Sequence, residues 1–511
     1  MQKKLRVKVL DIKEGKYEVT LNAEDARELG VHAGDRVKVY SDGVSRVARV
    51  SISRGAIAQG EAGVTLDLQE AFGLQDGASI AVAPTTKPRS VEYIRMKMDG
   101  MHLSESQLDA IVRDVVSREL SDVEIAAFIT ALYIHGLSMD EAASLSRRMA
   151  ENGEMLELRK KPVFDKHSIG GVPGNKITLL IVPIVAAAGL VIPKTSSRAI
   201  TSAAGTADVM EVLAPVSFSA EEIREIVERT NGIIAWGGGL NLAPADDIFI
   251  QVEYPLAIDP HHLALCSVMA KKYAVGANYV VIDIPMGREA KVKSMEEAKR
   301  YAREFIELGE RIGINVECAI TYGDKPIGRA IGPALEAKEA LSTLEAGAGP
   351  SSLVEKSLEL AGMLLEAGGV AGRGEGKKAA ERLLTSGKAL EKFREIIDAQ
   401  GGDGSVRASD VQVGEYREVI RSDGEGYVIG ISNHALVKIA REAGSPKDKG
   451  AGIVLHISKG EKVRRGDVLM EIYAESEYRL EQAVKLANQL KPITLEGMVL
   501  ARVPGITYIE H

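Results

Sequence analysis

The sequence predicts an α/β protein whose mostly parallel sheet is preceded by a β-rich unit and followed by a smaller unit with further strands. Residues 1–84 form short runs of alternating polar and apolar side chains separated by Gly and Asp turns, which is typical of strands. From about residue 160 a strand, a glycine loop and a helix follow one another repeatedly, the signature of an α/β sheet. From about residue 420 the strand pattern returns.

The first elements can be placed from local signals. The start of the chain, Met1 to Val19, alternates in polarity where a signal peptide would need a continuous apolar run, so it is predicted to be a strand. Two prolines in Pro84–Ser90 indicate a linker. Helical periodicity follows, with Ser104 as the predicted N-cap of one helix and Ser121 or Asp122 as that of the next.

The later elements are also marked. The most apolar stretch, Ile177 to Pro193, is shorter than the ~20 residues of a membrane span and contains Pro183 and Gly189, so it is predicted to be a buried helix leading into a strand. Near the end, residues 450–474 read as a Gly-turned hairpin, and a helix is predicted from Ser476.

Composition limits the function. A chain of 511 residues predicts three or four units of roughly 100–200 residues each. The formal net charge of −8 and the pI near 5.8 argue against nucleic-acid binding, which needs a basic face. The two cysteines, Cys266 and Cys318, offer no disulfide framework and fit a reducing cytoplasm. Asparagine and glutamine are scarce, at 9 and 10 residues, which favours a thermophilic source.

One loop stands out in the α/β region. The stretch "DKHSIGGVPGNKITLL", Asp165 to Leu180, puts a lysine, hydroxyls and glycines ahead of an apolar helix. Backbone N–H groups of such a loop and the helix N-terminus form an anion cradle, to which Lys166, Ser168 and Thr178 add a charge and two hydroxyls. The nucleoside-triphosphate loop and the dinucleotide fingerprint both fail on glycine spacing, and an ordinary connecting loop remains the alternative.

A second loop strengthens the case for an anion. "KTSSRAITSAAGTADVMEVL", from Lys194, again follows an apolar strand, again enters a helix and is rich in hydroxyl groups. Neighbouring strand ends of an open α/β sheet face one crevice, where such sheets bind ligands. The pair of loops predicts a phosphate-bearing substrate.

The chain resembles the thymidine and pyrimidine-nucleoside phosphorylases in these two loops and in two further stretches. The matching stretches, in order and spacing, are "IRMKMDGMHLSESQLDAIV", "DKHSIGG", "PKTSSRAITSAAGT" and "HHLALCSVMAKK". The resemblance implies a small α-helical domain hinged to a large α/β domain. The expected domains are the β-rich residues 1–84, the helical residues 88–155 plus 245–275, the α/β residues 160–240 plus 278–415, and a C-terminal α+β domain, 420–511.

The resemblance also implies roles for individual residues. The positions that match the orthophosphate ligands are Lys166, Ser168, Thr178, Ser196 and Thr206. Ser267 and Lys271 match groups that line the base. The full set expected to bind the remainder of the substrate is Gly171, Ser197, Arg198, Ala199, Ile200, Thr201, Ser202, Thr206, Ser267, Lys271 and Lys291.

Two departures from the family pattern point to a nucleotide. The arginine with which the pyrimidine enzymes read their base is matched here by Val252, so thymidine should not be favoured. A loop that is small and glycine-rich in the family is replaced by "PMGREAKVKS", with Arg288, Lys291 and Lys293. Extra cations suit a 5′-phosphate. With its β-rich start, the chain looks like the archaeal AMP phosphorylases, which convert AMP and phosphate to adenine and ribose 1,5-bisphosphate.

Asp259 is the predicted general acid for the departing base. It matches the proton-donor position of the AMP phosphorylases, and a base that leaves without a proton leaves as a costly anion. From the residues alone, Asp259 before Pro260 is an ordinary helix cap. Asp165, Asp208 and His167 are second choices.

Several alternatives stay open. The same architecture would suit a pyrimidine-nucleoside phosphorylase, an anthranilate-type phosphoribosyltransferase or a non-catalytic nucleotide sensor. His261, His262 and Cys266 could suggest a metal but have no partner cluster in the sequence, so no metal or cofactor is expected, orthophosphate being a co-substrate. AMP, CMP, UMP and GMP cannot be ranked. A homodimer or larger homo-oligomer is expected, with no membrane or nucleic-acid partner.

Overall fold

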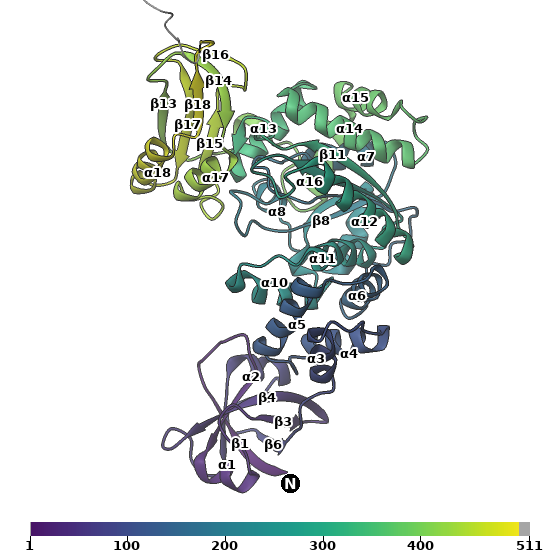
Figure 1. Ribbon diagram of the computed structural model, residues 1–511, viewed down its shortest axis with the longest axis vertical. Coiled ribbons are helices and arrows are strands. Elements are labelled where there is room, and N and C mark those ends of the chain that lie inside the picture. Colours follow the sequence, from purple (N-terminus) through teal and green to yellow (C-terminus); the bar gives the residue numbers. More distant parts are fainter. Residues whose placement is uncertain (1, 500–511) are drawn as a thin grey trace, which may run out of the picture. The chain divides into compact units, whose positions relative to one another are not determined.

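The computed structural model describes residues 2–499, which form two compact units (Figure 1). Within the described residues, the first unit comprises residues 2–153 and Ala243–Ala270, and the second comprises Glu154–Leu242 and residues 271–499. The chain passes from the first unit to the second for the last time between Ala270 and Lys271, inside helix α11 (His261–Ala274). Residues 500–511, the end of the predicted C-terminal domain, lie outside the described range.

The N-terminal strands close into a barrel, drawn in purple in Figure 1. The strand order is β1-β5-β2-β4-β3-β6, with β1–β5 and β2–β4 parallel and the other pairs antiparallel. Inward side chains such as Val19, Leu21 and Val39 are fully buried, as period-two alternation requires. Two short helices, which were not predicted from the strand pattern of residues 1–84, complete the barrel unit. The elements are β1 (Lys3–Val9), β2 (Glu18–Asn22), α1 (Ala23–Leu29), β3 (Arg36–Ser41), β4 (Val44–Ser53), β5 (Glu61–Val64), α2 (Leu66–Phe72) and β6 (Ser79–Pro84).

Helices make up the remainder of the first unit. They are α3 (Ser90–Met98), α4 (Glu105–Val116), α5 (Asp122–His135), α6 (Met139–Glu151), α10 (Pro244–Leu256) and the first part of α11. The predicted caps Ser104 and Ser121 are confirmed: their side chains accept hydrogen bonds from the backbone nitrogens of Gln107 and Glu124, three residues on, and both form complete capping boxes. These caps fix where α4 and α5 begin.

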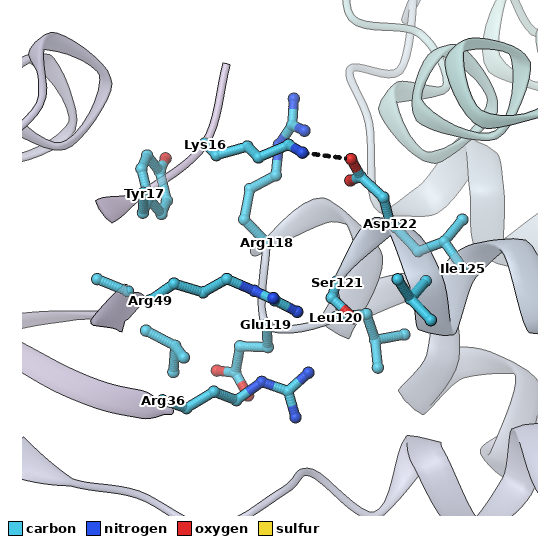
Figure 2. A pocket seen from close by; sticks show the side chains of 13 residues that line it. Lys16, Tyr17, Arg36, Arg49, Arg118, Glu119, Leu120, Ser121, Asp122 and Ile125 are labelled. Atoms are coloured by element: carbon cyan, nitrogen blue, oxygen red, sulfur yellow. Dashed lines mark ion pairs between the residues drawn. The ribbon is translucent and has the colours of Figure 1, made fainter. Parts of the chain in front are cut away.

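Charged pairs connect the barrel to the helices of the first unit. Arg36 on β3 pairs with Glu124 on α5, and Lys16 Nζ lies 2.6 Å from Asp122 Oδ2 (Figure 2). Lys16, Arg36 and Asp122 line a cavity of about 130 Å³, and Arg49 and Arg118 line it as well. None of the predicted site residues lines it.

Parallel strands form the centre of the second unit. Strand β10 lies between β7 and β11, and β8 pairs with β9, all in parallel. A single parallel bridge, Val163 to Val191, joins the two groups next to β7 and β8. The strands are β7 (Phe164–Ser168), β8 (Ile192–Ser196), β9 (Gly232–Trp236), β10 (Tyr279–Met286) and β11 (Asn315–Tyr322). The predicted parallel α/β arrangement is therefore confirmed.

Helices surround these strands. Helix α7 (Thr178–Ala187) is buried along almost its whole length, which confirms the sequence prediction for this apolar stretch. The other helices are α8 (Thr206–Met210), α9 (Ala220–Thr230), α12 (Met295–Ile312), α13 (Pro333–Ala346), α14 (Ser351–Ala367), α15 (Gly376–Thr385) and α16 (Lys388–Ala399), with short 3₁₀ turns at 237–239 and 408–410. In residues 2–499 no helix is both long and apolar enough to cross a membrane.

The C-terminal part adds two antiparallel sheets, in yellow-green in Figure 1. The predicted hairpin is present as β15 paired with β17, but the short β16 between them joins the other sheet through β14. The predicted helix begins after its cap Ser476. The elements are β12 (Ala330–Ile331), β13 (Tyr416–Arg421), β14 (Gly426–Ile431), α17 (Asn433–Glu442), β15 (Gly452–Leu455), β16 (Lys462–Val463), β17 (Val468–Ala474), α18 (Glu477–Leu490) and β18 (Ile493–Glu496).

Candidate active site

The predicted phosphate ligands lie where strands of the second unit end and helices begin. Lys166 is the third residue of strand β7 and Ser168 is its last, and Ser196 is the last residue of β8. Thr178 is the first residue of α7, and its buried Oγ1 has no hydrogen-bond partner in the described chain. A buried hydroxyl at a helix N-terminus is a ready donor to an anion.

The glycine loop predicted to bind phosphate, within residues 165–180, touches the loop that carries Lys291. Gly171 has φ +89°, and a Cβ built on it would lie 2.5 Å from the backbone nitrogen of Lys291. Only glycine permits both this conformation and this approach. The structure therefore brings together two segments, around Gly171 and Lys291, that are far apart in the sequence.

Two buried carboxylates, Asp283 and Asp165, hold the hydroxyl and ammonium groups around the predicted phosphate ligands. Asp283 on β10 is paired in register with Ser168, and its Oδ2 accepts a hydrogen bond from Ser168 Oγ at 2.7 Å. The same carboxylate lies 2.8 Å from Lys356 Nζ and accepts from Thr321 at 2.6 Å. Because Lys166 Nζ lies 3.1 Å from Ser168 Oγ, Asp283 orients both of these predicted ligands.

Asp165, the second of the two buried carboxylates, pairs with two buried lysines. Its Oδ2 lies 2.5 Å from Lys272 Nζ, and its Oδ1 lies 3.7 Å from Lys194 Nζ. All three side chains are almost completely buried. Asp165 is thus committed to two lysines, which argues against its second-choice role as general acid.

Burial and mutual repulsion lower the proton affinity of this cluster. Burial lowers the pKa of Lys166 to about 8, with Asp283 opposing the shift and Lys356 reinforcing it. Burial and the neighbouring lysines hold the pKa of Lys194 and that of His167 well below their usual ranges. His167 is therefore a neutral imidazole near pH 7, poorly suited to deliver a proton.

A buried lysine fixes the start of α7. The Lys176 ammonium donates to the carbonyl oxygens of Ile327 and Ala330 at 2.9 and 3.1 Å and to Glu339 Oε2 at 2.6 Å. Since Thr178 follows two residues later, these bonds hold a predicted phosphate ligand in place. Lys176 is not among the site residues predicted from the sequence.

The second loop is shaped by Asp208. Its Oδ2 accepts from the backbone nitrogens of Ala199 and Gly205 at 2.7 and 3.0 Å, and its Oδ1 lies 3.4 Å from the Arg198 guanidinium. With these partners Asp208 acts as a scaffold, which argues against a proton-transfer role. The backbone N–H groups of residues 200–204 have no hydrogen-bond partner in the described chain, so they are available to an anion.

Arg198 is also engaged within the second unit. Its guanidinium binds both carboxylate oxygens of Glu211, at 2.6 and 2.5 Å, and lies 4.9 Å from the centre of the Trp236 ring. The bond from Arg198 lowers the pKa of Glu211 to about 2. Of the predicted substrate residues in this loop, Ser197, Ile200, Thr201 and Ser202 follow β8 directly, and Thr206 begins α8.

Asp259 and Ser267 belong to the first unit. Asp259 is exposed and lies two residues before α11. The first turn of this helix is closed by a hydrogen bond from the backbone nitrogen of Ala264 to the carbonyl oxygen of Pro260. Ser267 Oγ donates to Asp246 at 2.8 Å. Lys271, further along α11, belongs to the second unit.

The possible metal ligands have other roles. His262 Nδ1 accepts from the backbone nitrogen of Leu137 at 3.2 Å, and Cys266 Sγ donates to the Ala142 carbonyl at 3.4 Å. Burial raises the pKa of the Cys266 thiol to about 12. Residues 2–499 contain no group of three or more His, Cys, Asp or Glu that could hold a metal ion.

Known proteins match the chain along nearly its whole length. Three family models match: the helical bundle domain of a glycosyl transferase family at 91–153, its a/b domain at 160–390, and the pyrimidine nucleoside phosphorylase C-terminal domain at 427–494. An AMP phosphorylase of Thermococcus kodakarensis is 53% identical over 98% of this chain and 100% of its own length. The chain belongs to the AMP phosphorylase family.

Other relatives agree with this assignment. The AMP phosphorylase of Pyrococcus furiosus is 52% identical over 98% of this chain and 99% of the relative. AMP phosphorylase 1 of Archaeoglobus fulgidus is 54% identical over 96% of each chain. Among solved structures, anthranilate phosphoribosyltransferase from Thermus thermophilus superimposes with a TM-score of 0.53 at 21% identity, covering 60% of this chain and 99% of that one. The last similarity shows a shared fold.

The Lys166 ammonium should set the pH dependence of phosphate use in this family member. With a pKa of about 8, the side chain is a cation below that pH and is neutral above it. We therefore expect kcat/KM for phosphate to fall by up to ~tenfold per pH unit above pH 8, since a neutral amine no longer attracts the anion. Steady-state rates at saturating AMP across this range measure the effect. A flat profile through pH 8 would contradict it, and Lys166→Met should show low activity without the step.

Proposed function

We propose that the chain catalyses the phosphorolysis of AMP to adenine and ribose 1,5-bisphosphate, a pentosyl transfer with orthophosphate as the second substrate. The close contact between Gly171 and the backbone of Lys291 carries this proposal. It sets a loop with three cations, Arg288, Lys291 and Lys293, against the loop predicted to bind orthophosphate. A substrate with a phosphate of its own suits such a pair of loops.

The proposed chemistry needs a nucleophile and an acid. An orthophosphate oxygen, held by Lys166, Ser168 and Thr178, attacks C1′ of the ribose. The bond from C1′ to the base breaks, its electron pair goes to the base nitrogen, and Asp259 supplies the proton. No metal or other cofactor takes part in the proposal. The transition state resembles an oxocarbenium ion, by analogy with glycoside cleavage.

Lys291→Ala tests the assignment of the 5′-phosphate. A hydrogen bond to a charged group contributes about 1.5–3 kcal/mol, so kcat/KM for AMP should fall roughly 10- to 100-fold while that for adenosine changes little. Released adenine is measured by chromatography with each substrate. Lys299→Ala is the matched control, because Lys299 is exposed on the neighbouring helix α12.

The outcomes separate the proposal from its rivals. Equal kcat/KM for AMP and adenosine in the unmodified protein would overturn the nucleotide assignment. If Lys291→Ala still prefers AMP to adenosine as strongly as the unmodified protein does, the 5′-phosphate is bound by residues other than Lys291. Binding of AMP without any release of adenine would show that the protein is a nucleotide sensor and not an enzyme. Parallel assays with CMP, UMP and GMP rank the bases.

We also propose a cytoplasmic homo-oligomer. Both cysteines are free, which suits a reducing compartment. Helix α5 exposes Val123, Tyr133 and Ile134, by 76%, 57% and 66%, and a second copy of the chain could cover them. Light scattering on the purified protein gives the mass in solution.

A further inference from the structure

The loop that carries Lys291 is tied to the C-terminal part of the chain. It joins β10 to α12, and its Glu289 side chain is half-buried. Both carboxylate oxygens of Glu289 accept from Ser432 Oγ, at 2.9 and 3.1 Å, and Oε2 also accepts from the backbone nitrogen of His434 at 2.9 Å. Ser432 is the N-cap residue of helix α17.

The partner of Glu289 is well suited to a carboxylate. The first N–H groups of a helix have no partner within it, and the helix dipole favours negative charge at that end. A neighbouring bond fixes the helix: Asn433, which is 1% exposed, donates from Nδ2 to the carbonyl oxygen of Gly323 at 2.9 Å. Glu289 therefore binds a rigid point of the C-terminal part.

The opposite side of the Lys291 loop contacts the glycine loop predicted to bind orthophosphate. Ala290 is buried, and the backbone nitrogen of Lys291 lies against Gly171. At its start the loop is held by Asp324, whose Oδ1 accepts from the backbone nitrogen of Arg288 at 2.6 Å. Residues 289–291 are thus held between helix α17 and the orthophosphate loop.

We propose that Glu289 is a positioning residue that, by anchoring this loop on the N-terminus of α17, makes the C-terminal part of the chain responsible for selecting nucleotides over nucleosides. The inference rests on the proposed function, because it assumes that Lys291 binds the 5′-phosphate. Glu289 itself would repel that phosphate if it faced it, but its carboxylate is committed to Ser432 and His434. The anchor keeps the acid away and the lysine in place.

Glu289→Ala tests the proposal through substrate selection. The loop should lose its fixed position, and kcat/KM for AMP should fall about tenfold, less than the roughly 10²-fold that a 1 Å misplacement can cause. The kcat/KM for adenosine, which has no 5′-phosphate, should stay within twofold of the unmodified protein. Glu289→Gln keeps an acceptor for Ser432 and should restore most of the selectivity.

A double-mutant cycle with Lys291→Ala makes the test specific. If Glu289 acts by positioning Lys291, Glu289→Ala should have no further effect on AMP once Lys291 is absent. Glu222→Ala is the matched control, because Glu222 also accepts from a serine hydroxyl and a backbone nitrogen at a helix start, at 2.9 and 2.7 Å. That control should leave both substrates unaffected.

Each result has one meaning. No effect of Lys291→Ala on AMP would overturn the proposed 5′-phosphate contact itself. An effect of Lys291→Ala together with unchanged selectivity in Glu289→Ala would overturn only the positioning role. Equal losses for AMP and adenosine in Glu289→Ala, or additive losses in the double mutant, would also overturn it, since general destabilisation acts on both substrates. Should Glu289→Ala not fold, Ser432→Ala weakens the same anchor and carries the same expectations.

Discussion

Asp259→Asn should lower kcat for AMP phosphorolysis by roughly 10²-fold or more, the usual scale of general acid catalysis. Asparagine has nearly the shape of aspartate but no proton to give. A proton needed only while the glycosidic bond breaks contributes to the transition state and not to substrate binding, so AMP affinity should change little. Initial rates of adenine release and equilibrium binding of AMP measure the two effects separately.

The alternative role of Asp259, at the start of helix α11, predicts a different result. Asparagine caps a helix about as well as aspartate, so a capping role would leave both rate and stability intact. Asp208→Asn is the informative companion, because Asp208 holds the backbone of the second loop and should act on stability as well as rate. Near-normal turnover by Asp259→Asn with an unchanged melting temperature would refute the catalytic role of Asp259.

Local signals in the sequence were sufficient for much of the fold. Capping boxes at Ser104 and Ser121 depend on residues three apart, and the buried helix α7 follows from one continuous apolar stretch. The two hydroxyl-rich loops were found because glycine and serine cluster directly after apolar strands. Both loops lie in the second unit at the ends of β7 and β8, as a parallel sheet requires.

Contacts between distant segments could not be predicted in the same way. Asp283 interrupts an apolar stretch, which hints at a buried charge, but only the pairing of β7 with β10 shows that Asp283 orients Ser168. The barrel closes through β1 and β6, at opposite ends of their segment. The Glu289 anchor on α17 spans more than a hundred residues of sequence, and nothing in the local pattern marks it.

Asp165→Asn should lower the free energy of unfolding of the α/β region by about 3–5 kcal/mol, the usual cost of removing one partner from a buried ion pair. Asparagine keeps the shape and the Oδ1 acceptor for the backbone nitrogen of Lys166. It removes the charge that compensates Lys272 and Lys194, 2.5 and 3.7 Å away. Two buried ammonium groups then lack a counterion, and Lys194 already has a pKa well below its usual range.

The experiment can follow this region specifically. The chain has 1 tryptophan, Trp236, at the end of β9 beside the site, so its fluorescence during guanidinium unfolding reports on the α/β region. Asp423→Asn, an exposed control on the C-terminal part, should stay within about 0.5 kcal/mol of the unmodified protein. Equal stability of Asp165→Asn and the control would show that the lysines need no carboxylate.

The pH dependence of the loss identifies its cause. In Asp165→Asn the buried Lys194, whose pKa burial already holds well below its usual range, has a folded-state pKa below the usual ~10.4 of the unfolded chain. Between those two values the unfolded chain binds more protons than the folded one, so stability of the variant should rise with pH across that interval. A deficit caused by lost hydrogen bonds or poor packing would stay constant instead. A deficit that narrows towards pH 10 therefore assigns the loss of stability to uncompensated charge on Lys194.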